Sequence, residues 1–380
     1  NSMNNYSNGK PMPSEMRAVI HIFSYDHELR EKALPYVDIE KEINAYLEFD
    51  SNVFRDKVVL LPCDDPEWSN FTLYFAQNFS RLGLKKLIST SYAPKNKQGD
   101  QSYQPSLFEE KSPQFDSDKS TACGKFFELE SDITKDGVVD INDIHWQYLK
   151  GDGDFRSDEV KALRDQADII VTNPPFSLFR DFIAWIMEGE KKFAIVGNMN
   201  SLTYKDIFPL IQKNIVWLGA TISSGDREFR VPDSYPLNAA GFRVDSEGNK
   251  YIRVKGVRWF TNIEHGRRHE PLQLMTTADN KRFNSKIEGK NAYQLYDNYN
   301  AIEVPFTNAI PSDYDGVMGV PISFLDKYNP EQFEILGMDF YVKDDLLENI
   351  ALAEWRGKLD RAYLNGKRLY SRVLICHKRI

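Results

Sequence analysis

Short apolar runs alternate with amphipathic segments along most of the chain. Four runs have the length and composition of strands buried on both faces of a parallel sheet: 57–62, 85–90, 168–172 and 192–198. Between the first two, residues 69–83 place several aromatic side chains on one helical face. Ser69 is suited to cap the start of that helix and Gly83 to end it.

The same alternation continues toward the middle of the chain. Apolar spacing predicts further helices at 38–49, 157–166, 176–189 and 204–213. Further strands are expected at 126–131, 215–222 and 251–262. Strands that alternate with helices in this way predict an α/β fold with a doubly wound, largely parallel sheet.

Changes in pattern divide the chain into three parts. Residues 1–30 form a polar tail that we expect to be partly disordered, and residues 31–265 carry the α/β alternation. Residues 266–380 are irregular and rich in Tyr, Asn and Pro, which predicts a smaller second domain. The polar stretch 93–120 is expected to be a long surface loop.

Composition limits the class of protein. No stretch approaches the roughly 18 apolar residues of a membrane span, and the polar beginning of the chain lacks a signal-peptide core. The three cysteines, Cys63, Cys123 and Cys376, are odd in number and widely spaced, which argues against a disulfide framework and against a zinc site. We therefore expect a cytoplasmic protein without a metal.

Charge is distributed unevenly, although the net charge is −8. Residues 351–380 carry eight Lys and Arg against Glu354 and Asp360, so a polyanion would meet the C-terminal part. The loop 223–236 follows a predicted core strand and adds two more arginines. The candidate DNA contacts are Arg227, Arg230, Arg267, Arg268, Arg356, Lys358, Arg361, Lys367 and Arg368. Solvated surface charge is the alternative explanation for each of them.

The segment Asn173-Pro174-Pro175-Phe176 follows an apolar strand and precedes a helix. In an open α/β sheet, ligands bind at this end of a strand. The Asn173 side-chain oxygen and the Pro174 carbonyl can accept the two N–H bonds of a ring-conjugated amine and favour its attack on a methyl group. The prolines stiffen the backbone, and Phe176 offers a flat face to a base taken out of the duplex. A simple turn with a helix cap is the alternative.

A second polar turn, Pro62-Cys63-Asp64-Asp65, ends the first predicted strand. Carboxylates can hold a ribose or an amine there, and the amides of the following helix can hold a carboxylate. The turn lacks the glycine-rich pattern of dinucleotide and phosphate loops, which argues against NAD and nucleotide triphosphates.

A third turn, Gly151-Asp152-Gly153-Asp154-Phe155, has the acidic spacing of a calcium loop but lacks the distal Glu of that motif. An ordinary turn is one reading, and a strand-end site for the adenine of a cofactor is the other.

These segments together resemble the EcoRI-type adenine-specific DNA methyltransferases over roughly nine-tenths of the chain. The most specific are the PCDDP turn and the late segment GVPISFLDKYNPEQFEILG. The resemblance implies a Rossmann-like methyltransferase core, S-adenosylmethionine as donor and duplex DNA as substrate, with residues 266–380 as the target-recognition region. It assigns catalysis to Asn173, Pro174, Pro175 and Phe176, and cofactor binding to Pro62, Cys63, Asp64, Asp65, Asp154 and Phe155.

The resemblance also bears on partners and on alternatives. We expect a monomer, and the resemblance is compatible with a separate cognate restriction endonuclease. An amino-methyltransferase that acts on RNA or on a protein glutamine is the first alternative, because Asn-Pro-Pro-Phe serves those reactions too. A catalytically silent DNA-binding module on the same fold is the second.

Overall fold

The computed structural model describes residues 34–64, 66, 69–93, 107–130, 146–222, 226–231, 242–344 and 349–379. The tail 1–30 lies outside these residues. The chain forms two compact units, each described here by itself. The first comprises Asn1–Ile207 with Val216–His265, and the second Phe208–Ile215 with Gly266–Ile380.

The described part of the first unit contains an eight-stranded mixed sheet in the order β4-β3-β2-β1-β5-β6-β11-β7. The central strands β2, β1, β5 and β6 are parallel to one another. On either side, each further strand is antiparallel to the strand that it pairs with on its inner side. Their bounds are β1 Val58–Leu61, β2 Lys86–Thr90, β3 Lys125–Leu129, β4 Gln147–Tyr148, β5 Ile169–Thr172, β6 Lys192–Asn198, β7 Trp217–Leu218 and β11 Val257–Thr261. This arrangement confirms the predicted α/β, Rossmann-like fold.

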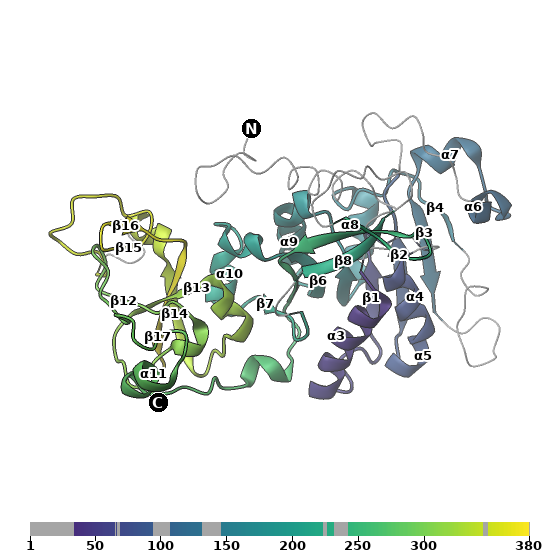
Figure 1. Ribbon diagram of the computed structural model, residues 1–380. Coiled ribbons are helices and arrows are strands. Elements are labelled where there is room, and N and C mark those ends of the chain that lie inside the picture. The colour runs from purple at the N-terminus through teal and green to yellow at the C-terminus, as the bar shows by residue number, and fades with distance from the viewer. Residues whose placement is uncertain are drawn as a thin grey trace. The chain divides into compact units, whose positions relative to one another are not determined.

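Helices cover both faces of this sheet (Figure 1). On one face of the sheet, alternate strand residues such as Val59, Leu87 and Val171 pack in an apolar core with side chains of α3 and α4. Phe179 of α9 packs against Phe260 of β11. The α-helices among the described residues of this unit are α3 Tyr36–Phe49, α4 Asn70–Gln77, α5 Phe79–Leu82, α6 Leu107–Lys111, α7 Ser117–Ala122, α8 Asp158–Gln166 and α9 Phe179–Glu188. Burial on both faces explains why β1 and β5 read as continuous apolar runs.

Three local predictions were wrong in detail. The helix expected at 69–83 is interrupted at Asn78, whose side-chain amide donates to the Tyr74 carbonyl at 2.8 Å. Part of the loop expected at 93–120 contains α6 and α7. The helix expected at 204–213 is shortened to α10, Phe208–Gln212, because proline at its second position suits a helix start and not an interior.

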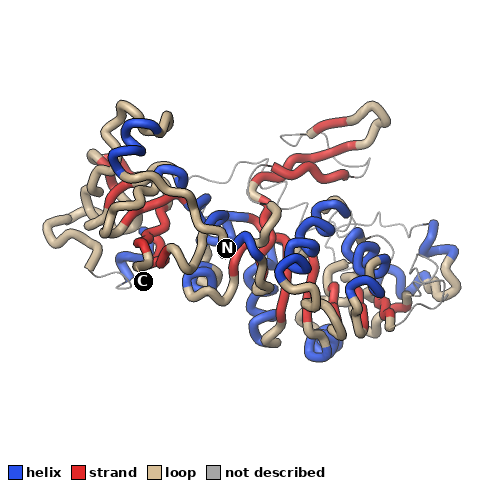
Figure 2. The backbone as a smooth tube through the Cα atoms, turned by 90° about the horizontal axis from the view of Figure 1, so that it is seen from below, coloured by secondary structure: helices blue, strands red, loops and turns tan. Residues whose placement is uncertain are grey.

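The strand expected at 251–262 is in fact two strands. Gly256 has a left-handed backbone with φ of +71°, a conformation that glycine adopts at little cost. It separates β11 from β10, Lys250–Lys255. β10 belongs to a small antiparallel sheet with β8, Asp226–Val231, and β9, Arg243–Val244. In Figure 2 these strands stand out from the helices of the unit.

A buried carboxyl group fixes α3 to the turn after β7. Glu42 is fully buried and accepts the backbone N–H groups of Ala220 and Thr221 at 2.8 and 2.9 Å. It also accepts the hydroxyl groups of Thr221 and Tyr46. Burial, together with the nearby Glu42 carboxyl, raises the pKa of Tyr46 well above its usual value. Gly219 is required beside it, since a Cβ there would lie 2.2 Å from a Glu42 oxygen.

The second unit has its own sheet and core. Strands β12 Ile302–Glu303, β13 Met318–Pro321, β17 Arg372–His377 and β14 Phe333–Met338 form a sheet in that order. Tyr296, Tyr299 and Leu374 are buried in its core. The second unit also contains α10, α11 Thr277–Phe283 and a hairpin of β15 Tyr363–Leu364 and β16 Lys367–Arg368. Within the described ranges, no helix is long and apolar enough to cross a membrane.

Removing the Glu42 carboxyl should destabilise the first unit. Glu42→Ala leaves the half-buried Ala220 and Thr221 N–H groups without their acceptor, and we expect the free energy of unfolding to fall by about 2 kcal/mol or more. Glu48→Ala, at an exposed position of the same helix, is the control. Urea titration followed by circular dichroism measures both, and equal midpoints for the two variants would contradict the assigned role.

Candidate active site

The polar segments predicted from the sequence meet at one edge of the large sheet. β1, β2, β5 and β6 are parallel, so their carboxyl ends lie at the same edge. Pro62–Asp64 follows β1, Ser91–Ala93 follows β2, and Asn173 follows β5. The structure thus gathers segments that are more than 100 residues apart, where α/β folds bind ligands.

Asp64 connects three elements at this edge. Its side chain is fully buried, and one carboxyl oxygen accepts the Ser69 hydroxyl at 2.7 Å while the other accepts the Thr172 hydroxyl. Ser69 is the N-cap of α4 and accepts from the Phe71 N–H. Thr172 is the last residue of β5 and also accepts the Cys63 N–H at 3.1 Å. The Asp64 side chain is therefore a positioning group for the turn after β1 and for the start of the Asn-Pro-Pro-Phe segment.

The end of β2 is fastened to the same turn. The Ser89 hydroxyl donates to the Asp64 carbonyl at 2.6 Å, and the Thr90 hydroxyl donates to the Pro62 carbonyl at 3.2 Å. Thr72 of α4 bonds to Ser89 in turn, at 2.8 Å. These fully buried hydroxyl groups stabilise the protein's own backbone. The resulting network holds the Pro62–Asp64 turn rigid.

The glycine-rich turn lies beside the end of β2. The Ala93 N–H donates to the Asp152 carbonyl at 2.6 Å. Gly153 has φ of +80°, and a Cβ there would lie 2.1 Å from the Ser91 carbonyl oxygen, so the close approach requires glycine. The sequence segments that suggested a cofactor pocket are therefore adjacent in space.

Asp154 and Phe155 in this turn already have protein partners. Burial raises the pKa of the Asp154 carboxyl, but hydrogen bonds from Arg156 outweigh it and the pKa is lowered overall. The Phe155 ring is 5% exposed and packs edge-on against Phe182 and Trp185 of α9, with centroids 5.0 and 5.6 Å away. In this structure Phe155 anchors the turn to α9.

The Asn-Pro-Pro-Phe segment is largely buried and lies at the carboxyl-end edge of the large sheet. Asn173 is 5% exposed, and both prolines are buried. Phe176 is half-buried, packs against the core of the unit, and begins a 3-10 turn, Phe176–Leu178, that leads into α9. The Leu178 N–H donates to the Pro175 carbonyl at 3.0 Å, which fixes the path of the backbone beyond the turn.

The arginines predicted near β8 differ in their surroundings. Arg227 is opposite Val254 in the small sheet, on the side that faces the unit, and its Nε lies 4.0 Å from Asp38 of α3. Arg230 is in register with Tyr251, but its side chain lies outside the described part of the structure, as does Asp65.

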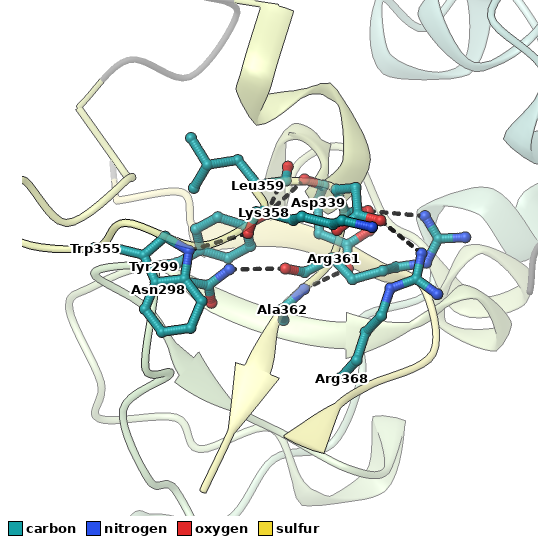
Figure 3. Close-up of polar contacts among 10 residues, drawn as sticks. Asn298, Tyr299, Asp339, Trp355, Lys358, Leu359, Arg361, Ala362 and Arg368 are labelled. Atoms are coloured by element: carbon teal, nitrogen blue, oxygen red, sulfur yellow. Dashed lines mark hydrogen bonds and ion pairs between the residues drawn. The ribbon is translucent and has the colours of Figure 1, made fainter. Parts of the chain in front are cut away.

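The basic candidates of the second unit divide by exposure. Arg361 is 7% exposed; its guanidinium donates to the Asp360 carbonyl and lies 4.9 Å from the Phe340 ring centroid. Arg368 is exposed and pairs with the Asp360 carboxyl at 2.7 Å (Figure 3). Arg361 is therefore part of the folded interior, and Arg368 borders it. Burial raises the pKa of neighbouring Asp339 to about 6.

The other candidates of that unit lie nearer to solvent. Arg356, Lys358 and Lys367 are exposed, and the Lys358 carbonyl accepts the Trp355 indole N–H at 3.0 Å (Figure 3). Arg267 and Arg268 are half-buried, and Arg268 donates to the Asn214 side chain at 3.1 Å. Exposure thus favours Arg356, Lys358 and Lys367 as contacts for a polyanion.

Sequence reasoning missed the hydroxyl groups that organise the site. Thr172 and Ser89 were read only as strand residues, although they connect β1, β2 and β5. A hydroxyl residue at the end of an otherwise apolar strand is the available signal. No cluster of His, Cys, Asp and Glu suited to a metal occurs within the described segments.

The mixed sheet, with β11 inserted antiparallel beside β6 and an Asn-Pro-Pro-Phe turn after β5, is that of a Rossmann-like methyltransferase. The family described as adenine-specific methyltransferase EcoRI matches residues 31–378, and the chain belongs to this family. It is a DNA methyltransferase.

Two curated relatives extend over nearly the whole chain. The type II methyltransferase M.EcoRI of Escherichia coli is 41% identical over 91% of this chain and 92% of its own length. The type II methyltransferase M.MpnI of Mycoplasma pneumoniae is 33% identical over 90% of this chain and 92% of its own. No solved structure matches the chain significantly.

The bond between Ser69 and Asp64 can be measured against a second serine cap. Ser69→Ala removes the cap of α4 and one partner of a buried carboxyl, whereas Ser157→Ala removes only the cap of α8. A lost cap costs about 1 kcal/mol, and we expect Ser69→Ala to cost roughly 1–2 kcal/mol more. Urea denaturation gives both values. If both variants lose the same free energy of unfolding, the hydrogen bond from Ser69 to Asp64 does not stabilise the protein.

Proposed function

We propose that this DNA methyltransferase transfers a methyl group from S-adenosylmethionine to the exocyclic N6 amine of adenine in duplex DNA. The observation that carries the proposal is the position of Asn173, directly after Thr172, which is held by Asp64 at the ligand-binding edge of the sheet. Family membership and the printed names of the relatives support it. Restriction–modification is the proposed setting, with a separate endonuclease and a monomeric methyltransferase in the cytoplasm.

The first unit offers a fitting place for the donor. Pro62, Cys63 and Asp64 form a turn between β1 and the start of α4, where helix amides can bind the donor's carboxylate. The hydroxyl network holds the Pro62 and Asp64 carbonyls, and with them the turn that leads to this helix. Asp65, Asp154 and Phe155 complete the proposed surroundings. When bound, S-adenosylmethionine supplies an activated methyl group on its sulfonium.

The residues after β5 would hold the acceptor amine. The Asn173 side-chain oxygen and the Pro174 carbonyl accept its two N–H bonds, so that the nitrogen lone pair is less delocalised into the ring as it attacks. Pro174 and Pro175 restrict the backbone and keep both acceptors in place. The Phe176 ring supports the base after it leaves the duplex stack. The amine proton departs to water after transfer, and a general base is not needed.

Product analysis tests the proposal. The protein is incubated with labelled S-adenosylmethionine and duplex DNA, and the DNA is digested to nucleosides. Label in N6-methyl-2′-deoxyadenosine is expected. Label in a methylcytosine, or in RNA or a glutamine-containing peptide but not in DNA, would replace the adenine assignment, and no transfer at all would indicate a silent DNA-binding module.

Asn173→Ala removes one acceptor of the amine. We expect turnover to fall on the order of 100-fold or more, while donor and DNA binding persist. The control is Asn70→Ala, at the first position of α4, where the side chain donates only to the Leu34 carbonyl. Steady-state kinetics together with calorimetry separate the two effects, and an Asn173→Ala variant with parental turnover would remove this residue from the mechanism.

Phe176→Ala should weaken the binding of an extruded adenine by roughly 1–3 kcal/mol, which is the usual contribution of a base stacked on an aromatic ring. Phe176→Tyr should retain most activity. A fluorescent base analogue at the target position reports extrusion. If its signal is unchanged on mixing with the parent protein, base flipping is contradicted.

A further inference from the structure

One end of the small β8–β10–β9 sheet contacts the carboxyl-end edge of the large sheet, where the candidate active site lies. The Asn198 side chain, at the carboxyl end of β6, donates to the Lys255 carbonyl at 3.0 Å, and the Met199 N–H donates to the Gly256 carbonyl at 2.6 Å. β6 lies directly beside β5, with Thr172 in register with Ile195. Both contacts lie within the first unit, so the base of the small sheet is fixed near Asn173.

The two faces of this sheet differ in character. Ile252 and Val254 of β10 point inward and belong to the apolar core of the unit. The alternate residues Arg253 and Lys255 are exposed. Inward packing therefore determines which residues are displayed outward.

Strand register gives the composition of the outward face. Tyr251, Arg253 and Lys255 of β10 lie opposite Arg230, Glu228 and Asp226 of β8, and Tyr251 also lies opposite Arg243 of β9. Among the side chains that the structure describes on this face, Arg243, Arg253 and Lys255 are basic. Two are acidic, Glu228 and Asp245, and the Asp245 carboxyl accepts the Tyr251 hydroxyl at 3.2 Å. The described face thus has one more basic than acidic side chain, whereas the whole chain has a net charge of −8. The local excess of positive charge is opposite in sign to that of the protein.

Contacts along the face hold part of it in a fixed arrangement. The Arg243 guanidinium lies 4.5 Å from the Tyr251 ring centroid and pairs with Glu228 at 2.9 Å, and this hydrogen bond keeps the pKa of Glu228 below its usual value. Arg253 lies 4.0 Å from the same carboxyl, and its side chain remains 54% exposed. Glu228 is thus shared by two arginines, which leaves a net positive surface.

We propose that the outward face of the β8–β10–β9 sheet binds the phosphate backbone of the duplex next to the target base. The inference rests on the proposed function, and it assigns Arg253 and Lys255 as contacts that the sequence did not reveal. If a target base binds at Asn173, the duplex from which it comes lies along the carboxyl ends of β5 and β6, beside the small sheet. Contacts to phosphate fix register and affinity without reading sequence.

The double variant Arg253→Gln/Lys255→Gln tests the proposal in the full-length protein. Duplex affinity is measured from 50 to 200 mM salt with two DNAs, one that the parent methylates and one that it does not. Loss of two phosphate contacts lowers the slope of log affinity against log salt by about two units, so the fall in affinity over this range shrinks about tenfold. Both duplexes should be affected alike.

The matched control is Lys57→Gln/Lys85→Gln. Both lysines are exposed and precede β1 and β2, at the opposite edge of the sheet, and the charge change is the same. The control should keep the parental slope. Glu228→Gln removes the acid that two arginines of the outward face share and should tighten binding to both duplexes.

Other outcomes overturn the inference. A double variant with the parental slope, or one that is weakened only on the methylated duplex, would show that this face does not bind the backbone. Failure of the proposed function is seen separately, since a parent protein that binds DNA but transfers no label to adenine fails in the product analysis whatever the slope of the variant.

Discussion

A single buried carboxyl group organises the candidate active site of the first unit. Asp64 accepts the hydroxyl that caps α4 and the hydroxyl that ends β5, so one side chain sets both the turn proposed for the donor and the residue before Asn173. A buried carboxyl is tolerated only when its oxygens are bonded. The same requirement that stabilises the fold therefore aligns the two halves of the site.

The sequence predicted the architecture well and its interruptions poorly. Strands such as 57–62 and 168–172 were evident because burial on both faces leaves only apolar residues. The break at Gly256 was missed because β10 and β11 each have strand composition, and only the positive φ between them separates two sheets. The interruption at Asn78 depends on a side-chain bond to Tyr74 that apolar spacing does not encode.

The candidate site shows the same division. Residues proposed to react, such as Asn173, could be named from their types and from their place after a strand. Residues that only position others were missed, because Thr172 acts through partners more than 100 residues away in the chain. Charge was also misleading when it was read along the sequence. Arg361 belongs to a basic segment yet is buried, whereas Arg253 owes its exposure to the pleat of β10.

In the proposed reaction, the bond from Thr172 to Asp64 aligns Asn173 for methyl transfer. The most direct measurement is the single-turnover rate of methyl transfer with saturating donor and duplex, compared between Thr172→Ser and Thr172→Val under conditions where both are folded and bind both substrates like the parent. Thr172→Ser keeps the hydroxyl and should react at close to the parental rate, whereas Thr172→Val should be slower by roughly 10- to 100-fold, because a small misplacement of a reacting group has an effect of that size. A Thr172→Val variant that transfers the methyl group at the parental rate would contradict the account.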